Sequence, residues 1–122
     1  MINSQTVLYR LRQLVTLDDE GAENALPLCE MCLEDMLCKL RKNADPNDPR
    51  IAQAAAALAC YRLALRNAGD SDGNVSFKAG DVTVTRTPAA MIEYAARMRD
   101  DAIIQAADLI TDNSFVFRQV GT

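Results

Sequence analysis

The segment from Asp48 to Ala68, DPRIAQAAAALACYRLALRNA, constrains the fold more than any other part of the chain. Asp48 is a favourable helix cap, and Pro49 suits the first helical turn because proline has no N–H to leave unpaired there. No helix-breaking residue follows until Gly69, which suits the left-handed end of a helix. Apolar residues follow the helical period, and the many alanines let other elements approach closely. The segment therefore predicts a buried central helix, residues 49–68, within a small helical bundle.

Length, composition and charge limit the class of protein. A chain of 122 residues, 49% hydrophobic and 25% charged, is typical of one globular domain, residues 1–122. No apolar run approaches the ~20 residues of a membrane span, and the N-terminus lacks the pattern of a signal peptide, so we expect a cytoplasmic protein that is not secreted. The net charge of -4, with neither half of the chain basic, argues against sequence-specific nucleic-acid binding.

Two further helices are predicted before the central one. Residues 5–15 carry an apolar stripe after a polar start signal. Asp18–Glu20 form an acidic cluster, which is a second start signal because acidic side chains favour the first turn of a helix. Proline inside a helix costs about 3 kcal/mol, so Pro27 predicts either a start near Asn24 or a kink before the proline. We therefore place the second helix at residues 24–41.

After the central helix the hydrophobic period changes from that of a helix to that of a strand. Apolar residues alternate with polar ones in two short runs, and these apolar residues are Val75, Phe77, Ala79, Val82 and Val84. The runs are separated by Gly80-Asp81, and glycine at the first turn position favours a type II′ hairpin. We predict a β-hairpin at residues 75–86. Thr87-Pro88 is another cap and first-turn signal, and it opens a last helix at residues 88–111.

The residue types give little support to catalysis or metal binding. The sequence has no histidine, which removes the usual general base near neutral pH and the commonest metal ligand. Cys29 and Cys32 have redox or zinc spacing, and Cys38 and Cys60 could complete a four-thiolate site. However, Cys38 and Cys60 form no tight pair, and three of the four cysteines fall on or beside apolar helix stripes, where cysteine behaves as a small hydrophobe. We predict free, non-catalytic cysteines, with no metal, no cofactor and no enzymatic activity.

The order of the elements resembles a known family. An alanine-rich helix contains Ala56-Ala-Leu-Ala-Cys-Tyr-Arg62, a Gly-Asp-centred hairpin follows as Val75-Ser-Phe-Lys-Ala-Gly-Asp-Val-Thr-Val-Thr85, and one more helix comes after it. This succession is similar to that of the small head–tail connector (adaptor) proteins of tailed phages and prophages. The likeness runs from about Thr6 to Ile110. The cysteine content and the Phe-Val-Phe tail depart from it.

The resemblance implies a structural protein of virion assembly. Subunits of that family assemble as a ring between the portal and the tail, so the expected partners are further copies of the chain, the portal protein and tail-completion proteins. The expected location is the virion or the bacterial host cytoplasm. Two other classes stay open: a helical interaction or scaffold module of unrelated function and, as the weaker alternative, a zinc or redox protein that uses the cysteines.

We expect strand-like segments to mediate contacts between subunits. A two-stranded hairpin has unpaired edges, and a free strand edge is a template for pairing with another chain. The tail, residues 112–122, would place its two phenylalanines on one face if extended, as an added strand or a hydrophobic anchor. The hypothetical interface residues are Val75, Phe77, Val82, Val84, Phe115 and Phe117. The alternative is that the tail folds back on its own helices.

Overall fold

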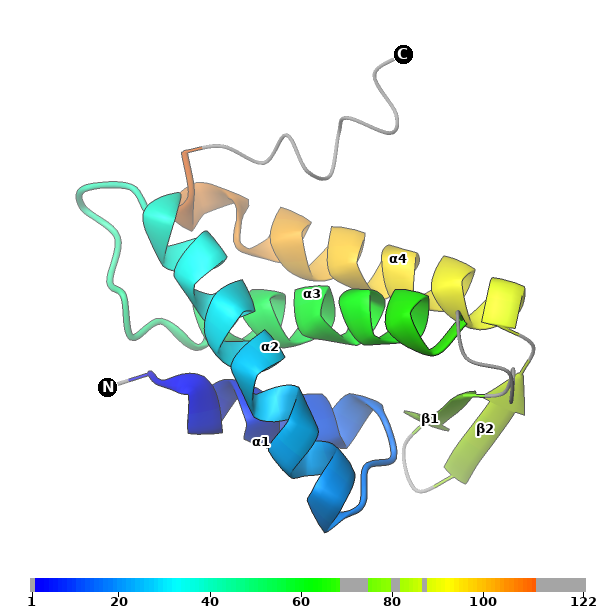
Figure 1. The fold of residues 1–122 in the computed structure, drawn as a ribbon. Helices are drawn as coiled ribbons and strands as arrows, with labels where there is room; N and C mark the ends of the chain where they lie inside the picture. The colour runs from blue at the N-terminus through cyan, green and yellow to red at the C-terminus, as the bar shows by residue number, and fades with distance from the viewer. Residues whose placement is uncertain (1, 69–74, 80–81, 87, 112–122) are drawn as a thin grey trace.

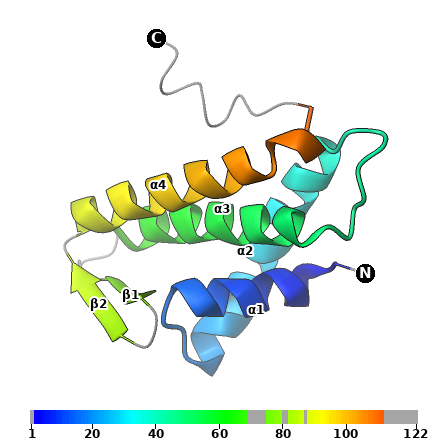
Figure 2. The ribbon, with the colours of Figure 1, turned by 180° about the vertical axis from the view of Figure 1, so that it is seen from behind.

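Four helices form most of the described chain, with the alanine-rich one at the centre. The computed structural model describes residues 2–68, 75–79, 82–86 and 88–111. Helix α3 (Pro49–Ala68) has the predicted bounds. It contacts α1, α2 and α4 (Pro88–Gln105), and α4 lies beside α3 along its length (Figures 1 and 2). The prediction of a mainly helical fold with about four helices is therefore confirmed.

Helix α1 (Ser4–Leu14) begins at a reciprocal cap. The Asn3 side chain accepts a hydrogen bond from the Thr6 N–H at 3.0 Å, and the Thr6 hydroxyl accepts one from the Asn3 N–H at 3.4 Å. Two backbone donors that the helix leaves unpaired are thereby satisfied. Val7 and Leu11, one turn apart, are fully buried against the other helices, so the apolar stripe faces the core as its period predicts.

The second helix begins earlier than the sequence indicated. Helix α2 spans Asp19–Cys38, so the predicted start near Asn24 is wrong. The Asp18 carboxylate caps it by accepting a hydrogen bond from the Gly21 N–H at 2.6 Å, and two acidic residues in the first turn complement the helix dipole. Pro27 lies inside the helix. Capping and the burial of Ala22 and Ala25, before the proline, offset its missing N–H.

A backbone contact between distant segments ends both α2 and α4 sooner than predicted. Leu40 and Ile110 form an isolated antiparallel bridge. The Arg41 N–H donates to the Leu109 carbonyl at 2.8 Å, and the Thr111 N–H donates to the Lys39 carbonyl at 2.6 Å. These groups pair across the chain, so neither helix continues: α2 ends at Cys38 instead of residue 41, and α4 gives way to a 3-10 turn, η1 (Ala107–Leu109).

Helix α3 is enclosed around its whole circumference. Every residue from Ala54 to Cys60 is buried, and seven residues make about two helical turns. Three helices pack on it from different sides, which methyl-sized side chains allow because they bring helix axes close together. The core of the domain is therefore built around α3.

Strands β1 (Val75–Ala79) and β2 (Val82–Arg86) lie between α3 and α4 in the chain. They pair antiparallel, and within the described residues they form a sheet of two strands. β1 contacts α1, and both views show β1 on the side of β2 that faces α1 (Figures 1 and 2). The connecting residues, Gly80 and Asp81, for which we predicted a type II′ turn, lie outside the described residues.

Candidate subunit interface

The strand positions of the hypothetical interface meet in one register. Phe77 pairs with Val84, and Val75 and Val82 lie two positions from them on their own strands. Residues directly opposite each other, and residues two apart along a strand, belong to the same face of a sheet. The register therefore gathers all four positions on one face, at the end of α4 where that helix begins.

The tail positions of the hypothesis, Phe115 and Phe117, lie outside the described residues. The structure does define where the tail starts. Thr111 is held by its N–H, at 2.6 Å, and by its hydroxyl, at 3.1 Å, both donating to the Lys39 carbonyl. Figures 1 and 2 show this point at the end of α4 that is remote from β1 and β2. The strands and the point where the tail starts are thus at opposite ends of α4.

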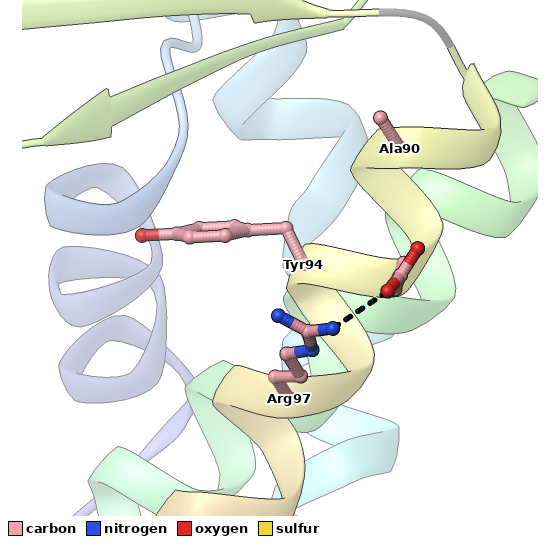
Figure 3. A pocket seen from close by; sticks show the side chains of 4 residues that line it. Ala90, Tyr94 and Arg97 are labelled. Atoms are coloured by element: carbon pink, nitrogen blue, oxygen red, sulfur yellow. Dashed lines mark hydrogen bonds and ion pairs between the residues drawn. The ribbon is translucent and has the colours of Figure 1, made fainter.

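A hollow on the outer face of α4 was not singled out from the sequence. Its described lining is Ala90, Glu93, Tyr94 and Arg97, and its volume is about 290 Å³. Arg97 donates to the Glu93 carboxylate at 2.7 Å, which fixes the guanidinium one turn away (Figure 3). Tyr94 is 42% exposed, and Figure 3 shows its ring projecting from the helix.

This hollow has the composition of a protein-contact surface. Tyrosine and arginine are enriched where proteins meet, since both combine a large apolar area with a polar end. From the sequence these residues had no role beyond their place in the predicted helix at residues 88–111. The signal that could have found them is their spacing of three, four and seven, which places them on one face of α4 near the strands.

A smaller hollow opens between three helices. The apolar part of its lining is Leu14 of α1, Ala57 of α3, and Met98 and Ala102 of α4, and its volume is about 130 Å³. The polar part of the lining is Gln53, Asp101 and Gln105. Gln53 accepts a hydrogen bond from Arg10 at 2.9 Å. At this hollow α1 and α4 cover α3 less tightly, although Ala57 itself is only 1% exposed.

One charged side chain is buried between α3 and α4. Arg99 is 3% exposed, forms an ion pair with Asp100 at 2.9 Å, and its guanidinium carbon lies 4.2 Å from the centre of the Tyr61 ring. Arginine stacks on an aromatic ring and pairs with a carboxylate through the same planar group. Arg99 therefore positions α4 on α3.

Burial keeps three of the four cysteine thiols protonated. All four are free, and Cys29, Cys32 and Cys60 are fully buried. Desolvation raises the pKa of Cys29 and Cys32 to about 11 and that of Cys60 to about 12. The thiolate is the form that binds metal or attacks a substrate. Because burial opposes that form, these cysteines act as core side chains, as the helix stripes predicted.

The fourth cysteine is separate from the others. Cys38 is exposed at the end of α2. Among the residues that the structure describes, no three histidine, cysteine or carboxylate side chains are grouped as metal ligands. The four-thiolate arrangement left open by the CxxC spacing is therefore not brought together. The Cys32 sulfur instead lies 3.5 Å from an Arg62 guanidinium nitrogen, and Arg62 pairs with Asp35 at 3.0 Å.

Comparison with known proteins adds no family to this picture. The chain matches no family model, no curated protein and no solved structure. Within the described ranges, none of the helices has the length and apolar character needed to cross a membrane.

Proposed function

We propose that the protein is a subunit of a phage or prophage head–tail connector, a ring that joins the portal to the tail. The observation that carries the proposal is the arrangement around α3. An alanine-rich helix is enclosed by three others, and a two-stranded element and one long helix follow it in the chain. This is the order of elements on which the resemblance to connector subunits rests.

The distribution of charged and sulfur side chains supports a structural role. Arg99 is engaged between two helices, Arg62 pairs with Asp35 across α2 and α3, and the buried thiols are held protonated. Each of these groups stabilises helix packing. The more exposed aromatic and ionic groups are on outer faces, where a partner protein meets them.

In this proposal the β1–β2 element, predicted from the sequence as an inserted hairpin, and the C-terminal tail are the contacts between subunits. The strand contribution comes from Val75, Phe77, Val82 and Val84, and the tail contribution from Phe115 and Phe117. A head-to-tail interface uses different patches on the two neighbours, and repetition of it closes into a ring when the rotation is suitable. The strands and the start of the tail at Thr111 lie at opposite ends of α4, which suits that kind of interface.

The test is assembly on a portal. The purified protein is mixed with portal rings, and negative-stain electron microscopy and sedimentation show whether it adds a ring of subunits. We expect binding by the wild type and a loss of ring formation in a variant with Val82→Asp and Val84→Asp. Met31→Asp is the matched control, because Met31 is 54% exposed on α2, and it is expected to leave assembly unchanged.

The outcomes separate the three classes of function. A chain that never binds a portal, alone or with tail proteins, contradicts the connector proposal and favours a helical interaction module. About one zinc per purified chain, measured by elemental analysis, favours the metal-binding alternative. A gene position beside portal and capsid genes supports the connector.

A further inference from the structure

β2 carries the edge of the two-stranded sheet that is turned away from α1. β1 is paired with β2 on one side and contacts α1, and both views show β2 on the side away from α1 (Figures 1 and 2). Within the described residues no third strand pairs with β2. A strand edge of this kind presents N–H and C=O groups in a row, which another strand can bind.

The register identifies the backbone groups at that edge. Ala79 and Val82 flank a two-residue connection and pair with each other. In a two-residue hairpin this flanking pair exchanges hydrogen bonds, and hydrogen-bonded and non-hydrogen-bonded pairs then alternate along the ladder. Val82, Val84 and Arg86 therefore use their N–H and C=O groups toward β1. Those of Thr83 and Thr85 are directed to the free edge.

The chain contains one further segment with the composition of a strand. Phe115-Val-Phe-Arg-Gln-Val120 consists largely of aromatic and β-branched residues, which favour strands. It begins four residues after Thr111, and its six residues match the usual length of a strand. A two-stranded sheet is marginally stable by itself, so a third strand would stabilise it.

Chain reach excludes pairing of this segment with β2 of the same molecule. The 18 residues of α4 separate the start of the tail from the strands, which is about 27 Å at 1.5 Å per residue. An extended chain covers at most ~3.3–3.6 Å per residue, so about eight residues after Thr111 are needed to return that distance. Only Gln119 and the residues after it could then reach the strands, and these are too few to form a paired strand with β2.

We propose that residues 115–120 of one copy add as a third strand to the free edge of β2 in a second copy, pairing with the backbone of Thr83 and Thr85. The inference rests on the proposed self-assembly and names its contact. Each copy then has one donor, the tail that starts after Thr111, and one acceptor, the β2 edge near the other end of α4. Such a contact is heterologous, and its repetition gives a ring or a filament.

The first experiment blocks the acceptor in the full-length chain. Thr83→Pro removes an outward N–H and places a ring on the edge, while the hydrogen bonds toward β1 stay intact. Thr83→Val is the matched control, because it keeps the N–H and favours a strand. Sedimentation velocity over micromolar to millimolar concentrations should show self-association of the wild type and of Thr83→Val, weakened at least about tenfold in Thr83→Pro.

The second experiment blocks the donor and then combines the two variants. The double variant Val116→Pro with Phe117→Pro removes two successive N–H groups of the tail. Successive N–H groups of a strand point to opposite edges, so the variant removes a pairing donor whichever edge of the tail faces β2. Val116→Ile with Phe117→Tyr is the control. Each blocked variant alone should remain a monomer. Mixed, they should form a 1:1 heterodimer and nothing larger, because only one donor and one acceptor remain. The heterodimer is expected even if Thr83→Pro disturbs β2, because in the mixture that variant contributes only its tail.

Three results would overturn the inference: a blocked variant that associates like the wild type, a mixture that stays monomeric while the wild type associates, or a wild type that is monomeric at every concentration. None of these decides the connector proposal, which depends on binding to the portal and is measured separately. Loss of portal binding with intact heterodimer formation would contradict the connector proposal alone.

Discussion

Alanine-to-leucine substitutions along α3 test whether this helix is enclosed on every side. Ala55 is 0% exposed and lies in the continuous buried stretch of α3. Three added carbon atoms have no free space at a site packed to the density of a protein interior. Overpacking of this kind lowers the free energy of unfolding by about 1–3 kcal/mol. Alanine is the better helix former by only a few tenths of a kcal/mol, so most of the loss reports packing.

Ala57 provides the matched control, two residues away on the same helix. It is 1% exposed, yet it lines the hollow of about 130 Å³ between α1, α3 and α4. A cavity of about 150 Å³ holds the six carbons of benzene, so this hollow has room for three. Each buried CH₂ contributes about 0.8 kcal/mol, and fixing the leucine side chain costs about 0.5–1 kcal/mol. Ala57→Leu should therefore raise the free energy of unfolding by about 1–2 kcal/mol.

Urea unfolding followed by far-UV circular dichroism measures both variants. The expected difference in free energy of unfolding between Ala57→Leu and Ala55→Leu is about 2–5 kcal/mol, with similar slopes because the surface exposed on unfolding hardly changes. Equal values for the two variants, or a neutral Ala55→Leu, would contradict close packing around Ala55 of α3.

Three further predictions concern capping, the buried arginine and the thiols. Asp18→Ala should lower the free energy of unfolding by about 1 kcal/mol and reduce helix content in urea and dichroism measurements, since the Gly21 N–H loses its acceptor. Arg99→Lys should cost about 1 kcal/mol in the same assay by losing the planar stack on Tyr61, whereas the exposed Arg97→Lys should change little. Burial raises the pKa of Cys60 from 9.0 to about 12, so above pH 9 the unfolded chain releases a proton that the folded chain keeps. Stability should therefore fall as pH rises past about 9, and less steeply in Cys60→Ala, in unfolding curves at neutral and alkaline pH.

Several features could be read from the sequence because they depend on neighbouring residues. The bounds of α3 follow from Asp48-Pro49 at its start and Gly69 after its end, with no breaker between them. The burial of Cys29 and Cys32 follows from their place on an apolar stripe. Caps, breakers and hydrophobic period act within a few residues, so the chain carries these signals whatever it packs against.

The other features of the fold depend on contacts between segments that are distant in the sequence. The start of α2 was misplaced because the local cost of Pro27 is visible in the sequence, whereas the burial that offsets it is not. The ends of α2 and α4 depend on the pairing of Leu40 with Ile110, seventy positions away in the chain. The place of Arg99 depends on Tyr61 of α3, which lies beneath its guanidinium group and is distant in the sequence. Local propensities are worth tenths of a kcal/mol per residue, whereas packing and paired backbone groups contribute about a kcal/mol or more each, so where the two conflict the tertiary contact determines the structure.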